Sequence, residues 1–392
     1  MMTQTNGSQP ESVRPVRLAS YLPGNNLGLP SLPLPARRLI GILEGTGIGP
    51  QIISATWQVL KSVEQVANLK IDVRHGGLIG EEAVASCGKW LPEDTMEFCA
   101  DIFQVGGAIL NGPGGGRYVY DLRRRFDLFC KFVPVRPAPE LARAGRIAPQ
   151  FLKKVDLLIV RDNTSGVYQG QWGDRATNQG RFAEHSFSYS EAEVHRLVEV
   201  AARAAADRQG KLHIIVKEGG VPTVTALWRD VGGAVARRHG VESTFMNVDL
   251  AAYELIQNPA QFDVIATPNL FGDILADVAG VLVSSRGVTF SGNFDAHGHG
   301  VFQTNHGCAH DLAHTDTANP AGQILSLAML LRESFGLDEA AALIEKSLAE
   351  VWRAGWRTAD LAEPGCQILG TKAMAKKVAE QVLRSAEIPQ LA

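Results

Sequence analysis

The feature that most constrains the fold is a repeated order of apolar run, glycine-rich turn and helical stretch, which begins near Arg38. Residues 39–43 are the first apolar run, the turn Glu44–Pro50 follows, and a helical stretch continues to Val66. Pro50 suits the first turn of that helix, where its missing N–H costs no hydrogen bond. Alternation of this kind indicates an α/β protein whose sheet is largely parallel.

The same alternation predicts further elements along the chain. We expect buried strands at Ile102–Val105, Leu157–Val160, Leu212–Val216 and Val264–Ala266. We expect helices at Glu191–Gln209, Thr223–Arg238, Leu270–Val281, Gly322–Phe335 and Leu337–Ala354. A chain of 392 residues exceeds one ordinary core, so it should form two domains or one elaborate domain.

Charge and cysteine content argue against several classes of protein. A net charge of -3 gives no attraction to nucleic acid or to an acidic membrane surface, and no apolar run is long enough to span a bilayer. The five cysteines are odd in number and lack CxxC spacing, which disfavours a zinc site or a disulfide framework. This usage is typical of a reducing compartment, so we expect a cytoplasmic location.

Residues 1–37 differ in composition from the rest of the chain. They are rich in Pro, Gly, Asn and Ser, and they lack the apolar core of a secretory signal. Arginines such as Arg14 and Arg17 hint at a transit peptide, but Glu11 and the prolines argue against the amphipathic helix that such a peptide needs. We expect an extension that lies on the surface or is disordered.

The glycines after the first strand do not predict a Rossmann fold. The spacing of Gly45, Gly47 and Gly49 does not fit GxGxxG, and Pro50 stands where that motif needs a plain helix start. Asp72 lies at a suitable distance for a ribose-binding acid, but a single glycine cluster is a weak signal. A tight turn that joins a strand to a helix is the preferred interpretation.

Two carboxylates at helical spacing carry a stronger signal. Asp273 and Asp277 are four residues apart, so on a helix they point to the same side and repel each other. A divalent cation would reverse that repulsion, since Mg²⁺ and Mn²⁺ bind a few carboxylates together with substrate oxygens. The flanking residues are apolar, which favours a metal over a solvated acidic face. Asp249 is a possible third ligand.

Five segments resemble, in chain order, motifs of the isopropylmalate/isocitrate dehydrogenase family, the β-decarboxylating dehydrogenases. Each motif alone is moderately specific, but five in the same order are highly specific. The likeness extends from about residue 38 to the C-terminus. The segments are residues 44–50 (the opening loop), 122–129 (the first substrate helix and strand), 161–170 (a substrate Arg and a catalytic Tyr), 262–277 (the metal-binding segment) and 305–320 (the cofactor loop).

The resemblance implies a metal-dependent oxidation followed by decarboxylation. Asp249, Asp273 and Asp277 would hold Mg²⁺ or Mn²⁺, with Asp249 supplied by a second subunit. Lys217 would act across the dimer in deprotonating the substrate hydroxyl, and hydride would pass to NAD. Tyr168 would protonate the enolate that remains after CO₂ has left.

Further residues would bind the substrate and the cofactor. Arg123 and Arg161 would bind substrate carboxylates, a task that suits the guanidinium group. The resemblance assigns the cofactor to His306, Gly307, Asp311 and Asn319. Asp311 would accept hydrogen bonds from the adenosine ribose and repel a 2′-phosphate, so NAD should be preferred to NADP. His306 and His310 are not expected to form a metal pair, because their neighbours indicate a loop.

The implied architecture is two α/β domains around a cleft, with a large mixed sheet rather than a Rossmann fold. The cofactor-binding domain would comprise residues 38–128 and 285–392, and the dimerisation and catalytic domain residues 129–284. Gly166–Ser190 would be an arm that clasps a partner. A homodimer is the least assembly that could share Lys217 and Asp249 between active sites.

The sequence departs from the family pattern in the substrate pocket. Val133 stands where the family has a second arginine before a proline. Lys131 shares the face of Val133 on a regular strand, whereas Arg136 would need a bulge to reach the same place. Gly219 stands where the family often has Asn, two residues after the catalytic Lys.

The loop that reads the substrate's side group also differs. Residues 111–120 lack the acid that some members place near the nicotinamide, and they offer Arg117 for an anionic substituent and Tyr118 or Tyr120 for an aromatic or polar one. We therefore expect a specialised 3-substituted malate as substrate. A regulatory homologue without turnover, a dehydrogenase that does not decarboxylate and a pure ligand-binding protein are the alternatives. The retention of Lys217, Tyr168 and the metal aspartates favours an active enzyme.

Overall fold

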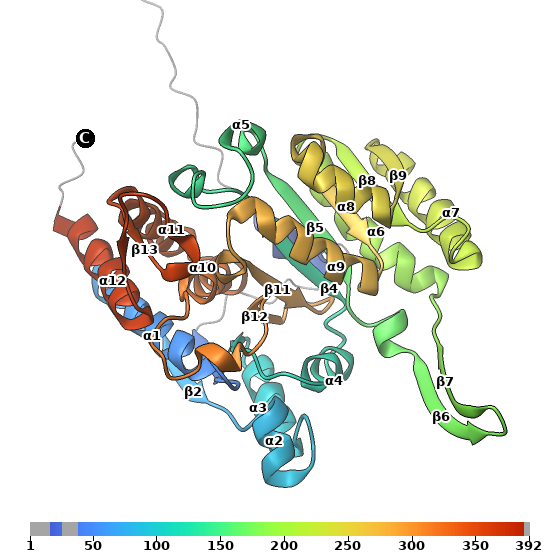
Figure 1. Cartoon of the computed structure of the whole chain (residues 1–392), viewed down its shortest axis with the longest axis horizontal. Helices are drawn as coiled ribbons and strands as arrows, with labels where there is room; N and C mark the ends of the chain where they lie inside the picture. Colours follow the sequence, from blue (N-terminus) through green and yellow to red (C-terminus); the bar gives the residue numbers. More distant parts are fainter. Residues whose placement is uncertain (1–15, 26–37, 388–392) are drawn as a thin grey trace, which may run out of the picture.

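The computed structural model describes residues 16–25 and 38–387. Its centre is one sheet of ten strands with helices packed around it (Figure 1). The expected α/β fold with a large mixed sheet is confirmed. In sheet order the strands are β2 (Asp72–His75), β1 (Leu39–Leu43), β3 (Ala108–Asn111), β12 (Gly300–Thr304), β11 (Phe290–Phe294), β4 (Cys130–Val135), β5 (Leu157–Asp162), β10 (Val264–Thr267), β8 (Lys211–Val216) and β9 (Glu242–Asn247).

The sheet is antiparallel in the middle and parallel on both sides. Strands β12, β11, β4 and β5 pair antiparallel in that order, while the outer strands pair parallel. The boundary between β11 and β4 divides the sheet in two. Strands from residues 39–111 and 290–304, including β11, lie on one side of it, and strands from residues 130–267, including β4, lie on the other. The two groups of strands come from the same parts of the chain as the two expected domains. The domain boundaries themselves stay a prediction.

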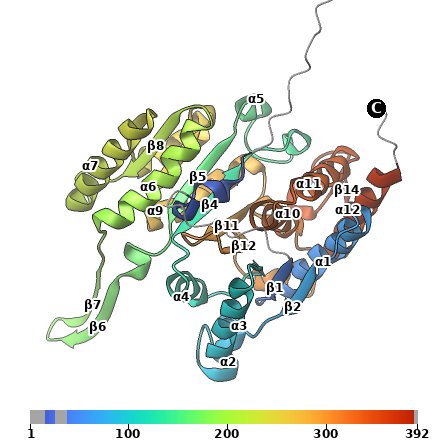
Figure 2. The ribbon, with the colours of Figure 1, turned by 180° about the vertical axis from the view of Figure 1, so that it is seen from behind.

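Helices gather at both ends of the sheet. Figure 2 shows α6 and α7 beside β8, and α1, α11 and α12 together at the opposite end. The helices are α1 (Gly49–Val66), α2 (Gly80–Cys87), α3 (Glu93–Gln104), α4 (Tyr118–Arg125), α5 (Pro149–Leu152), α6 (Glu191–Ala206), α7 (Pro222–His239), α8 (Val248–Gln257), α9 (Asn269–Gly280), α10 (Ala321–Phe335), α11 (Asp338–Arg353) and α12 (Thr371–Glu387).

One predicted strand is wrong. Ile102–Val105 is not a strand but the last turn and the end of α3. Cys99, Ile102 and Phe103 follow helical spacing and are buried together. A short apolar run cannot distinguish a strand from the buried face of a helix, and the strand begins only at Ala108.

Local signals explain where other elements begin. Ser190 and Glu193 form a capping box at the start of α6, in which Ser190 Oγ accepts from the Glu193 N–H and the Glu193 carboxylate accepts from the Ser190 N–H. Pro222 occupies the first position of α7. Within the described part of the chain, no helix combines the length and the apolar character that a membrane crossing requires.

Part of the N-terminal extension lies against the folded body. The Ala19 N–H donates to the Glu333 carboxylate of α10 (3.0 Å), and Arg203 of α6 donates to the carbonyls of Ser20 and Tyr21 (3.0 and 2.7 Å). The segment therefore contacts helices from both halves of the sheet. The rest of the extension, with Glu11 and Arg14, lies outside the described residues.

A long hairpin projects from the body in the region expected to form an arm (Figure 1). Strands β6 (Gln171–Thr177) and β7 (Gly180–Ser186) pair antiparallel, and every residue in them is exposed. The exposed residues include Trp172 and Phe182. Exposed aromatic side chains on a projecting hairpin are typical of a surface that contacts another chain.

Candidate active site

Asp273 is the point at which three predicted site residues meet. It lies in the second turn of α9, and its Oδ1 accepts from Arg161 Nη1 of β5 (2.5 Å). The hydroxyl of Tyr168, in a short 3-10 turn after β5, donates to Asp273 Oδ2 (2.8 Å). Asn269, at the start of α9, accepts from Arg161 Nη2 (2.8 Å) and so fixes the guanidinium from its other side. The structure therefore brings together Arg161, Tyr168 and Asp273.

The surroundings of Asp273 determine the protonation states of Asp273 and of Tyr168. Burial opposes ionisation of Asp273, but Arg161, Lys131 and the Tyr168 hydrogen bond outweigh it and lower the pKa of this carboxyl. Burial and the neighbouring Asp273 raise the pKa of Tyr168. Asp273 therefore stays a carboxylate, and Tyr168 keeps a proton that it can donate.

Two more cations are buried beside this group. Arg123 of α4 and Lys131 of β4 are each 4% exposed. Burial and the nearby Arg161 lower the pKa of Arg123 to about 10, and burial and Arg123 lower the pKa of Lys131. Arg123 Nε has no hydrogen-bond partner among the described residues. Buried cations with unused donors are costly unless an anion compensates them, so the cluster is suited to binding a carboxylate.

Lys131 and Arg136, the two candidates to replace the missing arginine, lie in different places. Val133 is buried in the core of β4. Lys131 is directly opposite Arg161 in the β4–β5 register. Arg136 lies beyond the end of β4, is exposed and pairs with Asp156 (2.6 Å). Strand β4 has no bulge that would redirect Arg136 toward the site. The prediction that Arg136 could replace the missing arginine is therefore wrong.

Arg117, the residue before α4, lies among aromatic rings from α4, β6 and the turn after β5. The Arg117 guanidinium lies 4.4 Å from the Trp172 ring centre and 5.5 Å from that of Tyr120. Its Nη atoms donate weakly to the Tyr168 carbonyl (3.4 Å). The Tyr120 and Tyr168 rings are 5.0 Å apart. Arg117 and Tyr120 are therefore next to Tyr168.

Tyr118 is not available to a ligand. Its side chain is 3% exposed, its hydroxyl donates to the Gly112 carbonyl (3.1 Å), and it accepts from Asn111 Nδ2 (2.9 Å). The suggestion that Tyr118 reads the substrate's side group is therefore wrong. Its position at the start of α4 turns the ring into the core, where it holds the loop.

Lys217 and Asp249 form a separate pair. Lys217 Nζ donates to Asp249 Oδ1 (2.7 Å), and this hydrogen bond lowers the pKa of Asp249. Asp277, one turn after Asp273, pairs with Arg286 (3.0 Å). Within residues 16–25 and 38–387, the three aspartates do not form a cluster close enough to share one ion. A single chain thus does not bring the three predicted ligands together.

The predicted cofactor residues lie on the loop that follows β12. Burial lowers the pKa of His306, whose Nδ1 donates to the Gly307 carbonyl (3.0 Å). Asn319 lies just before α10, and its Oδ1 accepts from the Ala321 N–H (2.9 Å). Asp311 is exposed in a 3-10 turn at 310–312. The loop conformation expected around His306 is confirmed.

The opening glycine turn contacts this loop closely. The Ile48 N–H donates to the Cys308 carbonyl (2.9 Å), and a Cβ on Gly47 would lie 2.1 Å from that same oxygen. Gly47 also has φ +62°, a conformation that glycine adopts at little cost. The glycines of this turn therefore allow two loops to approach, which explains their spacing without a Rossmann motif.

The sequence comparisons identify the family of this chain. A family profile described as isocitrate/isopropylmalate dehydrogenase matches residues 39–378. The chain belongs to this family. It is 38% identical over 352 residues to the 3-isopropylmalate dehydrogenase of Parasynechococcus marenigrum (86% of this chain, 98% of the relative). It is 36% identical over 357 residues to that of Carboxydothermus hydrogenoformans (87% and 94%).

Solved structures agree at the level of the fold. The crystal structure of isocitrate dehydrogenase from Methylococcus capsulatus matches with a TM-score of 0.78 and 28% identity, over 88% of this chain and 99% of that chain. The resemblance expected from five motifs is thus confirmed. The chain is a dehydrogenase of the isocitrate/isopropylmalate type.

Several residues that complete the site were not identified by the sequence analysis. Asn269 and Trp172 have no unusual spacing, and only the fold shows that they contact Arg161 and Arg117. Arg286 pairs with Asp277 although no sequence pattern links the two. The one available signal was Asn269, which lies inside the metal-binding segment and could have been assigned a role.

Proposed function

We propose that the protein catalyses the metal-dependent, NAD-linked oxidative decarboxylation of a 3-substituted malate. The observation that carries this proposal is the meeting of Arg161, Tyr168 and Asp273 beside the buried cations Arg123 and Lys131. This arrangement combines a carboxylate, a protonated phenol and an anion-binding surface. Those groups suit a substrate that carries two carboxylates and must be protonated on carbon after CO₂ leaves.

The donor set fits a hard divalent cation. Asp273 and Asp277 project from successive turns of α9 and are each partly exposed, and Asp249 of a partner subunit would be the third ligand. Their oxygen atoms are the ligands that Mg²⁺ and Mn²⁺ prefer. When bound, such a cation acidifies a substrate hydroxyl and stabilises developing negative charge. Its binding would require Arg161, Tyr168 and Arg286 to release the carboxylates that they hold.

The chain's own groups would then move two protons. Lys217 of a partner subunit would accept the proton of the substrate hydroxyl as hydride leaves for NAD. Tyr168 would donate its proton to the carbon that loses CO₂. Burial and the neighbouring Asp273 raise the pKa of Tyr168, so the group carries at neutral pH the proton that this role requires. The aromatic contact between Tyr120 and Tyr168 would hold the donor ring in place.

The cations indicate a specialised substrate rather than isopropylmalate or isocitrate. Lys131 gives a point charge where an arginine would make two parallel hydrogen bonds, so the geometry of the bound carboxylate should differ. Arg117 lies over Trp172 at the edge of the site, donates weakly to the Tyr168 carbonyl, and pairs through Nε with Asp121 (3.6 Å). It is available to an acidic substituent, and the Tyr120 ring is available to a bulky one.

NAD binding is proposed for the loop at 305–320. Asp311 is exposed and would contact the adenosine ribose, while His306, Gly307 and Asn319 would position the dinucleotide. The hydrogen bonds of the opening turn to this loop support a preformed cofactor site. The neighbouring Asp316 adds negative charge that opposes a 2′-phosphate.

A homodimer is proposed because one chain holds only part of the site. Lys217 and Asp249 pair with each other, and the three aspartates do not form one cluster within the described part of a single chain. Helices α8 and α9 expose Leu250, Tyr253 and Ile274, large apolar side chains that a second copy would cover. The projecting hairpin offers a second contact. The cytoplasmic location inferred from cysteine usage stays a prediction.

The test is a panel of 3-substituted malates assayed with NAD and Mn²⁺, with NADH and CO₂ measured together. Isopropylmalate and isocitrate would be compared with carboxylated, phosphonylated and aromatic analogues. Equal release of NADH and CO₂ from one analogue is expected. NADH without CO₂ would indicate a dehydrogenase that does not decarboxylate, and binding without NADH would indicate a regulatory or ligand-binding protein. A kcat/KM for isopropylmalate or isocitrate in the range of about 10⁴–10⁸ M⁻¹s⁻¹ would contradict the specialised substrate.

A further inference from the structure

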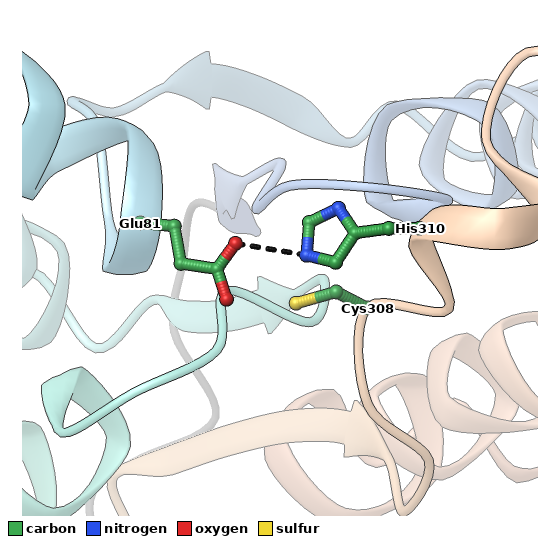
Figure 3. Close-up of side chains that lie close together, drawn as sticks. All are labelled: Glu81, Cys308 and His310. Atoms are coloured by element: carbon green, nitrogen blue, oxygen red, sulfur yellow. Dashed lines mark ion pairs between the residues drawn. The ribbon is translucent and has the colours of Figure 1, made fainter.

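We infer that Glu81, Cys308 and His310 form a second cation site, one that binds a thiophilic divalent ion such as Zn²⁺. A thiol sulfur, an imidazole nitrogen and a carboxylate oxygen of these residues all lie within 4.8 Å of one another. Figure 3 shows the three side chains converging from α2 and from the loop after β12. It is the one cluster of this kind in the part of the chain that the structure describes, and it contains none of the aspartates at 249, 273 and 277.

The chemistry of the three groups differs from that of the Asp273 site. A thiolate and an imidazole select zinc and similar ions, whereas Mg²⁺ prefers oxygen ligands alone. A thiolate and a carboxylate would also balance the charge of one divalent ion, with the imidazole neutral. Three protein ligands and one water complete the tetrahedral arrangement common for zinc.

The surroundings hold two of the ligands and leave access for an ion. Cys308 is buried, its carbonyl accepts from the Ile48 N–H (2.9 Å), and its Sγ accepts from Thr46 Oγ1 (3.2 Å). The Glu81 N–H donates to the Gly114 carbonyl (3.0 Å), which fixes the start of α2. The side chains of Glu81 and His310 are 48% and 57% exposed, so both can rotate toward the sulfur.

Gly115 lies against two of the three ligands. A Cβ at this position would lie 2.7 Å from Glu81 Oε1 and 3.3 Å from Cys308 Sγ. A side chain here would therefore press on both groups, and glycine avoids that contact.

An ion pair alone explains less of this arrangement. His310 Nε2 lies 2.8 Å from Glu81 Oε2, but an exposed pair of this kind contributes little stability. It also gives no reason for a thiol beside both groups. Binding of the cation would release the Cys308 thiol proton to solvent and replace the His310–Glu81 hydrogen bond with two bonds to the metal. It would tie the loop that carries Asp311 to the start of α2.

Cobalt binding to the full-length, chelator-stripped protein tests this site. Co²⁺ should bind with one ion per chain in a thiolate-to-cobalt charge-transfer band, which Zn²⁺ abolishes and excess Mg²⁺ leaves intact. The band should be absent from Cys308→Ser and present in Cys87→Ser, a control at an exposed cysteine. It should also survive in Asp273→Asn, which separates this site from the proposed catalytic one.

A second variant keeps the test decisive if Cys308→Ser does not fold. His310→Ala alters an exposed side chain, and it should weaken Co²⁺ binding by more than the roughly 10–100-fold that loss of an outer-sphere partner costs. Absence of the band in the wild-type protein would overturn the inference. So would a band that persists in Cys308→Ser, or cobalt affinity that His310→Ala leaves unchanged.

Discussion

Lys131 and Arg161 lie directly opposite each other on the antiparallel strands β4 and β5, and both side chains are buried. Like charges that face each other across two strands repel, so this pair weakens the sheet. Asp273 offsets part of the repulsion through its ion pair with Arg161. The remaining positive charge supports the proposal that a substrate carboxylate binds between the two side chains.

Replacing Lys131 with Met should therefore weaken substrate binding without lowering the stability of the protein. Loss of a buried charge partner costs about 3–5 kcal/mol, so kcat/KM should fall by about 10²–10⁴. The free energy of unfolding should stay the same or rise, because a desolvated like charge has been removed. Arg136→Met is the matched control, since Arg136 is exposed and pairs with Asp156. Wild-type kcat/KM in Lys131→Met would exclude the lysine from substrate binding.

Much of the fold could be predicted from the sequence because its signals are local. Apolar runs at 39–43, 157–160, 212–216 and 264–266 are strands as expected, and the five expected helices after residue 190 are present. The prediction of a strand at 102–105 was wrong because a run of four apolar residues is too short to show whether its period is that of a strand or of a helix. Strand order depends on long-range pairing, which no local pattern encodes.

Site residues that lie in a recognisable motif could be predicted from the sequence. Residues whose role depends on a contact made in the fold could not. Asp273, Arg161 and Tyr168 were identified from their segments, and the fold brings them into contact. The choice between Lys131 and Arg136 needed the register of β4 against β5. The cluster of Glu81, Cys308 and His310 joins distant parts of the sequence, so the absence of CxxC spacing, which argued against a zinc site, could not reveal it.

The metal requirement should be visible in both chelation and substitution. EDTA should abolish turnover, and Mn²⁺ or Mg²⁺ should restore it. Asp273→Asn should lower kcat strongly while leaving the protein folded, because Asp273 is partly exposed and the amide can still accept from Arg161 or Tyr168. Circular dichroism and steady-state kinetics measure the two effects. Full turnover in the presence of EDTA would refute the metal assignment.

Asp311 should determine the choice between NAD and NADP. Its exposed carboxylate would repel a 2′-phosphate, so NAD should give the higher kcat/KM. Asp311→Ala should reduce that preference, mainly by weakening NAD binding. Asp101→Asn, which removes an exposed charge on α3, should leave the preference unchanged. An equal or higher kcat/KM with NADP in the wild-type enzyme would contradict this role.

Glu333 should make stability depend on pH. Burial raises the pKa of this carboxyl to about 7 from 4.5, and the side chain accepts from the Ala19 N–H. A raised folded-state pKa contributes stability that is fully present below the unfolded value and is lost as pH rises through the folded value. Between about pH 5 and 8, wild type should lose up to about 3 kcal/mol relative to Glu333→Gln.

Denaturant unfolding of both proteins across that pH range measures the difference. The Gln side chain keeps an acceptor for Ala19 but carries no charge, which makes it the matched reference. A constant difference between the two proteins from acid to mildly alkaline pH would show that Glu333 does not titrate there.

The most direct test of the proposed enzyme is complementation between two inactive chains. Tyr168→Phe and Lys217→Met should each lower the turnover of the homodimer by about 10²–10⁴-fold, because each removes one proton-transfer group. If every active site takes Tyr168 from one subunit and Lys217 from the other, a heterodimer of the two variants has one intact site. Heterodimers purified by two different affinity tags should therefore show about half of the wild-type activity per dimer. A heterodimer no more active than either parent would contradict an active site shared between subunits.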